Sequence, residues 1–294
     1  MGNERARCCG RLGAHIVAVY DPVVERAGAL AVQHAKAVTC RTPEEVLSQN
    51  VDALFICTPP DKRGSMYHAV NMGVPFFVEK PLAISASEAA GMLAGLRAKP
   101  VLHGVGYMSR WRAGVLHAKR TLSSKRFLGI VGYWAGPKYK VPWWLDSRSS
   151  GGPVNDQAIH LFDLYRFIGG EVISVQSAVD GHQLPLTLAC SFRFASSALG
   201  ALFYSCEAQD KQIGIRIVTA EGSLQLSGPE LRLTENTIDG TFPENQDEDI
   251  FELETKQFLN AVLRNDPSLV ASDFEDAYCT QRLVDAALSR ATRV

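Results

Sequence analysis

Three ionisable side chains occur at helical spacing within one otherwise apolar segment. Asp156, His160 and Asp163 stand at positions i, i+4 and i+7, which predicts that they share one face of a helix. A histidine, with an ordinary pKa of about 6.5, suits proton transfer near neutral pH when carboxylates flank it. A single histidine in a helix is usually structural, but two carboxylates beside it in so apolar a helix favour a functional site.

A lysine at the end of a predicted strand could complete such a site. The segment Phe76–Pro81 begins as an apolar run typical of a buried parallel strand and ends in Glu79, Lys80 and Pro81. Ligands of open α/β sheets lie at the carboxyl ends of the strands, so Lys80 could reach a bound small molecule. The proline after it ends the strand. A lysine after a strand is also common on ordinary surfaces, and only the second charged cluster favours function here.

Strands and helices alternate through the first third of the chain, which predicts a parallel, doubly wound sheet. Asp21 ends one predicted strand, where a dinucleotide-binding fold places the carboxylate that binds the ribose of NAD and repels the 2′-phosphate of NADP. The alternative is that Asp21 caps the helix that follows Pro22. The predicted strands are Ala14–Asp21, Val38–Cys40, Val51–Cys57 and the run within Phe76–Pro81, and helices are predicted at Asn3–Leu12, at Val23–His34, after Thr42, up to Met72 and after Ser85.

The glycine fingerprint of a dinucleotide-binding fold is incomplete. Gly2 stands where the last glycine of G-x-G-x-x-G would fall, but the first strand and the first two glycines do not occur. Because that strand is central in the order 3-2-1-4-5-6, we expect two central strands without a ladder partner and a pyrophosphate without its backbone cradle. Three interpretations remain open: a truncated gene model, a strand supplied by a neighbouring segment or chain, and a degraded, non-catalytic relative.

The pattern changes after Gly129 to extended runs, several with one polar face, which predicts a mostly antiparallel open sheet. We therefore predict an incomplete Rossmann-like domain at residues 1–99 and an α+β domain at residues 100–294. The insertion at residues 136–150 carries Trp143 and fits either the mouth of a site for a polar ring such as a sugar or a packed surface loop. The strands are expected at Ile130–Ala135, Val172–Val179, Leu188–Phe194, Leu199–Cys206, Gly214–Thr219, Ser223–Leu226 and Leu231–Thr234.

Composition narrows the function classes. The net charge of −1 disfavours nucleic-acid and membrane-surface partners, and no apolar run approaches the roughly 20 residues that span a bilayer. The N-terminus shows no signal peptide. Seven cysteines without a C-x-x-C pair predict buried free thiols in a reducing cytoplasm and no metal site, and the adjacent Cys8 and Cys9 are unsuited to pair.

Four motifs, in this order and spacing, resemble the Gfo/Idh/MocA family of NAD(P)-dependent sugar and polyol oxidoreductases. The resemblance implies a Rossmann domain followed by an α+β domain whose large open sheet often forms the oligomer interface, and hence a homodimer or homotetramer. It also implies a small sugar-like or polyol-like substrate and NAD as cofactor, with NADP as the alternative. The motifs are Thr58-Pro59-Pro60, Glu79-Lys80-Pro81, Gly106–Trp111 and Gly151–Asp163.

The same resemblance implies roles for individual residues in the reversible oxidation of a secondary hydroxyl, with hydride passing to nicotinamide C4. His160 would be the general base, Lys80 would hydrogen-bond the reacting oxygen, and Asp156 would orient substrate and imidazole, with Asp163 as a structural partner. The expected cofactor-binding residues are Gly2, Asp21, Thr58, Pro59, Pro60, Glu79 and Lys80, and the expected substrate-binding residues are Lys80, Tyr107, Arg110, Trp143, Asp156 and His160.

One departure and two competing classes remain. Asp61-Lys62-Arg63 stands where the family usually has a histidine, and Arg63 would alter the contact made there. A non-catalytic sensor of the same fold would have no need for Lys80, Asp156 and His160 together, although the incomplete fingerprint favours it. An enzyme for a non-sugar substrate, such as a dihydrodiol or a bilin-like pigment, would be favoured by absence of the aspartate–histidine pair, which is present.

Overall fold

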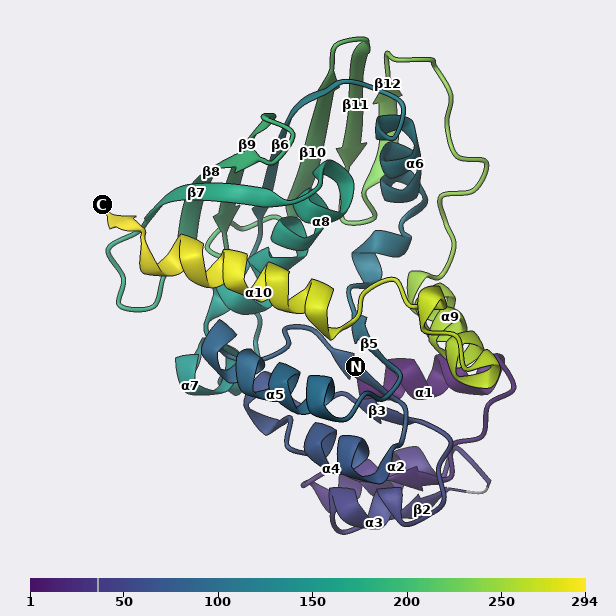
Figure 1. Ribbon diagram of the computed structural model, residues 1–294. Coiled ribbons are helices and arrows are strands. Elements are labelled where there is room, and N and C mark those ends of the chain that lie inside the picture. Colours follow the sequence, from purple (N-terminus) through teal and green to yellow (C-terminus); the bar gives the residue numbers. More distant parts are fainter. Residues whose placement is uncertain (36) are drawn as a thin grey trace.

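The computed structural model, which describes residues 1–35 and 37–294, begins with alternating short strands and helices (Figure 1). All strand pairs in this part are parallel, as predicted. The strands are β1 (Ala18–Val19), β2 (Val38–Thr39), β3 (Leu54–Ile56), β4 (Phe76–Glu79) and β5 (His103–Gly106), and the helices are α1 (Gly2–Arg11), α2 (Val24–Ala31), α3 (Pro43–Leu47), α4 (Ser65–Met72) and α5 (Ala86–Ala98).

These strands form two separate ladders rather than one sheet. β1 pairs with β2, and β3, β4 and β5 form a second sheet, with no ladder between β1 and β3 in the described residues. This confirms the prediction that two strands expected at the centre would each lack one neighbour. It also explains why the predicted strand Ala14–Asp21 shortens to Ala18–Val19: β1 has a single partner, and that partner is two residues long.

Local sequence signals set most helix ends as predicted. The hydroxyls of Thr42 and Ser85 accept hydrogen bonds from the amides of Glu45 and Glu88 at the first turns of α3 and α5. Gly73 ends α4 in the left-handed conformation, at φ 71°, which glycine adopts without steric cost. β5 pairs with β4, so the parallel sheet continues to Gly106, past the boundary predicted near residues 99 and 100.

The second part is built on one eight-stranded sheet in the order β12-β11-β10-β6-β9-β8-β7-β13. Only the pairs β6–β9 and β7–β13 are parallel, so the sheet is mostly antiparallel, as predicted. The strands are β6 (Phe127–Ala135), β7 (Val172–Val179), β8 (Thr187–Phe194), β9 (Leu199–Ser205), β10 (Gln212–Thr219), β11 (Gly222–Ser227), β12 (Arg232–Asn236) and β13 (Thr292–Arg293).

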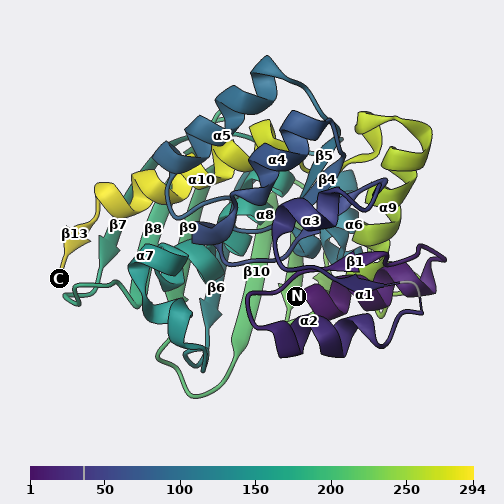
Figure 2. The same cartoon turned by 90° about the horizontal axis from the view of Figure 1, so that it is seen from below.

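Helices cover one face of this sheet (Figures 1 and 2). α8 packs on β6, and α10 packs on β7 and on α5 of the parallel part, so α10 lies between the two halves of the molecule. α9 packs on α1. The α-helices of this part are α6 (Ala113–Leu122), α7 (Ser147–Ser150), α8 (Ile159–Gly169), α9 (Ile250–Arg264) and α10 (Phe274–Ser289), and short turns of other helix types occur at η1 (Pro60–Lys62), η2 (Met108–Trp111), η3 (Pro142–Leu145), η4 (Val154–Ala158) and η5 (Pro267–Leu269).

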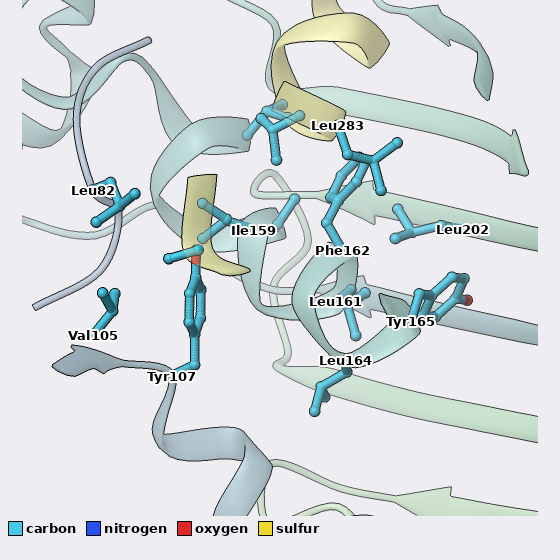
Figure 3. Packing of buried hydrophobic residues seen from close by; sticks show 14 of the residues in the cluster. Leu82, Val105, Tyr107, Ile159, Leu161, Phe162, Leu164, Tyr165, Leu202 and Leu283 are labelled. Atoms are coloured by element: carbon cyan, nitrogen blue, oxygen red, sulfur yellow. The ribbon is translucent and has the colours of Figure 1, made fainter. Parts of the chain in front are cut away.

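The hydrophobic core lies around α8, which is buried along nearly its whole length. Figure 3 shows Ile159, Phe162 and Tyr165 of this helix turned into the core, with Leu202 of β9 close by. All seven cysteines are free; five are buried, and Cys57 and Cys279 are partly exposed. Because α8 is fixed by core packing on several sides, the polar groups at its start are held in one position.

Candidate active site

Lys80 and Asp156 meet where the parallel part contacts the second part. The ammonium of Lys80, just after β4, donates to the backbone oxygen of Asp156 at 2.7 Å and to its carboxylate Oδ1 at 3.1 Å. Both side chains are largely shielded from solvent. Charge-assisted bonds of this kind are stronger than neutral ones. The lysine is therefore held at the carboxyl end of its strand by Asp156, a residue that the sequence placed in the same site.

Asp156 lies in a single π-helical turn, η4, directly before α8. A π-turn bonds residue i to i+5 and is frequent at functional sites. It changes the angular offset between Asp156 and the residues of α8 from that of an uninterrupted α-helix. Asp156 bonds Lys80, whereas Asp163 bonds Arg110 in a buried network. Asp163 is thus the structural partner that we expected.

Trp144 provides the second hydrogen bond to the carboxylate of Asp156. Its indole Nε1 donates to Asp156 Oδ2 at 2.8 Å, so each carboxylate oxygen has one partner. Trp144 is fully buried, and the ring of Tyr139 lies 5.0 Å from it. The sequence pointed to this loop but named Trp143, which is partly buried and packs against the hydrophobic core. The polar and aromatic composition of the loop was the available signal; which of two adjacent tryptophans turns inward was decided by the short helix η3.

His160 is buried near Lys80 and is held by ring stacking. Its imidazole lies parallel to the indole of Trp134 on β6, with ring centroids 5.8 Å apart and planes at 11°. Its Nδ1 has no hydrogen-bond partner among the described residues. Burial, reinforced by the charges of Lys80 and Lys211, lowers the pKa of His160 well below its usual value. The imidazole is therefore neutral at neutral pH.

Two residues expected to bind substrate lie in the buried interior instead. Arg110 donates to both carboxylate oxygens of Asp163, at 2.9 and 2.5 Å, and to Asp276 at 2.6 Å. Tyr107 is only 1% exposed, and burial raises the pKa of its phenol well above the usual value. A substrate contact by either residue stays a prediction; the carboxylates of Asp163 and Asp276, which the sequence did not pair with Arg110, draw the guanidinium inward.

Glu79 likewise faces the interior rather than a ligand. Arg5 of α1 donates to it at 2.7 Å and to Glu254 of α9 at 2.5 Å, with all three side chains buried. The role of Glu79 in cofactor binding stays a prediction, and its observed partner is Arg5. One guanidinium serves two carboxylates, and burial, together with the charge of Glu79, raises the pKa of Glu254 to about 7 despite Arg5.

Arg63 also turns inward and contacts the segment that follows Lys80. Its guanidinium donates to the carbonyl of Ile56 at the end of β3, at 3.0 Å, and to that of Pro81, at 3.4 Å. Burial lowers its pKa to about 10. Arg63 thus ties the carboxyl end of β3 to the segment after Lys80, and it acts on the site through the backbone that carries the lysine.

Three residues expected to bind a dinucleotide lie after β1, after β3 and at the start of α1. Asp21 lies partly exposed beyond β1, and its Oδ1 accepts from the amide of Val23 at 2.8 Å, which fits the alternative of a local cap and leaves Oδ2 for a ribose. Thr58 follows β3 and donates to the carbonyl of Lys62 at 2.6 Å. A Cβ on Gly2 would lie 3.9 Å from Cys57, so the N-terminus of α1 faces the end of β3. A glycine-rich cradle for the pyrophosphate is not among the described residues.

Comparison with known proteins gives two matches to families. Residues 3–107 match the family described as oxidoreductase family, NAD-binding Rossmann fold, and residues 125–225 match the GFO/IDH/MocA C-terminal domain. Within the described residues, none of the helices combines the length and apolar character needed to cross a membrane.

Several characterised relatives have sequences similar to this one. A scyllo-inositol 2-dehydrogenase (NAD(+)) of Bacillus subtilis is 32% identical over 55% of this chain and 49% of its own length. A D-apiose dehydrogenase of Paraburkholderia graminis is 27% identical over 78% of this chain and 65% of its own. The match thus spans about half to two thirds of these relatives.

Solved structures share the fold along almost the whole chain. Levoglucosan dehydrogenase in complex with NADH superposes with a TM-score of 0.85 at 18% identity, covering 99% of this chain and 94% of that one. The WlbA dehydrogenase of Bordetella pertussis, in complex with NADH and UDP-GlcNAcA, gives 0.85 at 19% identity, covering 99% and 92%. At these identities the likeness concerns the fold.

Proposed function

Because the chain belongs to the Gfo/Idh/MocA family of oxidoreductases, we propose that it transfers a hydride between a nicotinamide cofactor and a secondary hydroxyl or ketone of a sugar, polyol or related small molecule. The observation that carries this proposal is the bond between Lys80 and Asp156 at the junction of the two parts, with His160 buried near enough for the charge of Lys80 to lower its pKa. The names of the inositol and apiose dehydrogenases support the substrate class.

Lys80 is suited to bind the reacting oxygen. An ammonium has three N–H donors, and Asp156 takes two of them through its backbone and side-chain oxygens. The third donor remains for the substrate oxygen, whose alkoxide character Lys80 would stabilise. Asp156, fixed by Trp144, thereby sets the direction of the lysine as well as its charge environment.

His160 is suited to accept the hydroxyl proton. Its low pKa keeps the imidazole neutral, and two positive charges contribute to that low value. Negative charge that develops on the substrate oxygen would offset the repulsion by Lys80, so His160 would become more basic as the proton leaves. A bound nicotinamide would supply the hydride acceptor at C4; Asp21 would favour NAD, and NADP is the alternative.

The apolar outer face of the large sheet favours a homodimer or homotetramer formed through this face. We also propose that the protein acts in the cytoplasm. This face carries exposed apolar side chains on neighbouring strands: Tyr133 of β6 lies opposite Phe203 of β9, and Leu199 is 64% exposed on the same strand. Contiguous exposed apolar patches of this kind mark interaction sites. Light scattering on the purified chain would give the mass; a monomer at micromolar concentration would contradict this assignment.

Substitution at the site tests the function directly. NADH formation with inositols and with neutral sugars should fall by a factor of about 100 or more in Lys80→Met and in His160→Ala, because each removes a group that acts on the reacting hydroxyl. Lys62→Met is the matched control, since Lys62 is exposed and pairs with Asp61. Unchanged rates in the two site variants would refute the assignments.

A non-catalytic regulator is the second candidate, favoured by the separation of β1 from β3. It predicts NADH or sugar binding by the full chain, seen as a fluorescence change, without turnover on any tested hydroxyl. Turnover that depends on Lys80 would exclude it.

A further inference from the structure

Lys211 lies beside the site but takes no part in the chemistry described above. It immediately precedes β10 and shares a sheet face with Ile213, because alternate residues of a strand point to the same side. Ile213 pairs with Trp134 of β6, and both are buried on the face that α8 covers. Lys211 therefore extends from this inner face at its rim, where it is exposed.

Its ammonium reaches the stack that holds the predicted base. Lys211 Nζ lies 5.1 Å from the ring centroid of Trp134, and Trp134 stacks on His160. A cation over an indole face is attracted to it, which favours this position of the side chain. The lysine stem borders Gly136, where an added Cβ would lie 3.5 Å from Lys211 Cγ. Lys211 thus lies against Trp134 and next to Gly136, where the loop that carries Trp144 begins.

The positive charge of Lys211 has no close counter-ion. Among the described residues, no carboxylate forms a salt bridge with it; Glu230 acts on it from farther away, and Arg112 opposes Glu230 with a second positive charge. Arg112 itself has a buried Nε without a partner in the described residues. Lys80, by contrast, is paired with Asp156. The ammonium of Lys211 therefore has no direct salt-bridge partner among the described residues, although Glu230 acts on it from a distance.

We propose that Lys211 is a specificity-determining residue that binds an anionic group of the substrate, a carboxylate or a phosphate, so that the preferred substrate is an acidic sugar or polyol derivative. This rests on the proposed function. An anion would form a charge-assisted hydrogen bond with Lys211, whereas a neutral hydroxyl would gain much less. It would also offset the charge of Lys211 at His160 and make the imidazole a stronger base in the complex.

The test compares glucose, glucuronate and glucose 6-phosphate as probes of the full chain. Binding is followed by tryptophan fluorescence, to which Trp134 and Trp144 contribute, and turnover by NADH formation. We expect at least one anion to bind more tightly than glucose, and Lys211→Met to weaken anion binding about 10- to 100-fold while glucose binding stays unchanged. Lys211→Arg should retain the preference. Lys138→Met is the control, because Lys138 is exposed but already pairs with Glu207.

The outcomes separate the sources of the anion. A loss confined to glucuronate assigns a carboxylate, and a loss confined to glucose 6-phosphate assigns a phosphate. Equal losses for all three probes, absence of anion binding, or an equal effect of Lys138→Met would overturn the proposal. Anion binding that depends on Lys211 without turnover of any probe would refute the oxidoreductase function and leave the anion site standing. As a second readout, Lys211→Met should raise the pKa of His160 in an NMR titration.

Discussion

The hydrogen bond between Trp144 and Asp156 can be tested by Trp144→Phe. The substitution keeps an aromatic ring but removes Nε1, which donates to Asp156 Oδ2 at 2.8 Å. Oδ2 then loses its hydrogen-bond partner, and because the Asp156 side chain is largely shielded from solvent, water cannot easily replace it. Hydrogen bonds to charged groups contribute about 1.5–3 kcal/mol, and a small cavity would add to the loss. We therefore expect the free energy of unfolding to fall by about 2–4 kcal/mol.

Activity should fall as well, through the position of Lys80. Asp156 Oδ1 accepts from the ammonium, and a carboxylate freed on its other oxygen can rotate away from it. A misplaced catalytic group costs about 10- to 100-fold in rate. We expect kcat to decrease by that factor with little change in the affinity for NADH.

Urea denaturation and steady-state kinetics measure the two effects. Trp143→Phe is the matched control. Trp143 packs against the core, and no side-chain hydrogen bond is seen for Trp143 in the described part of the chain. A midpoint shift of equal size in both variants, or a wild-type kcat in Trp144→Phe, would show that the indole–carboxylate bond neither stabilises the fold nor positions the lysine.

Two further predictions concern the buried charges. Arg110→Leu leaves Asp163 buried and without its guanidinium, so the free energy of unfolding should fall by about 3–5 kcal/mol in urea titrations, and a loss below 1 kcal/mol would contradict the network. Burial raises the pKa of Glu254 from 4.5 to about 7, so the protonated form is favoured in the fold and stability is lost as pH rises through that range. Glu254→Gln should remove up to roughly 3 kcal/mol of this pH dependence. The free energy of unfolding is measured between about pH 5 and about pH 7, the span of the shift. The same slope in the variant and in the wild type would contradict the prediction.

Features that depend on neighbouring residues in the chain were predictable from the sequence. The caps at Thr42 and Ser85 and the stop at Gly73 follow from side chains within one helical turn of the backbone they bond. The alternation of buried and exposed residues along the strands of the second part was also predictable, because successive side chains of a strand point to opposite faces of the sheet and only one face is covered. Even the gap between β1 and β3 followed from an expected strand that the sequence does not contain.

Pairings between distant charges were not predictable in the same way. Arg110 and Glu79 belong to motifs that the resemblance connects with a site, yet each meets a charged partner from a remote helix, Asp276 of α10 and Arg5 of α1. A sequence shows that a charge is present but not which opposite charge the fold brings within 3 Å or so, and buried charges require such partners. The π-turn at Asp156 was not predictable either, because the apolar periodicity of the sequence does not show the extra residue in that turn.

The site depends on Asp156 because it joins three separate segments. Its side chain receives one bond from Lys80 after β4 and one from Trp144 in the loop after β6, and its own position is set by the start of the buried helix α8. Arg63 fixes the lysine segment from below through the carbonyl of Pro81. Loss of one supporting bond weakens the position of Asp156 but keeps the bond from Lys80 to its backbone oxygen, which predicts graded rather than complete loss of activity for the supporting residues. Removal of the carboxylate in Asp156→Ala should instead break the side-chain bonds to both Lys80 and Trp144 and leave Lys80 only its bond to the backbone oxygen, so its cost should exceed that of Trp144→Phe.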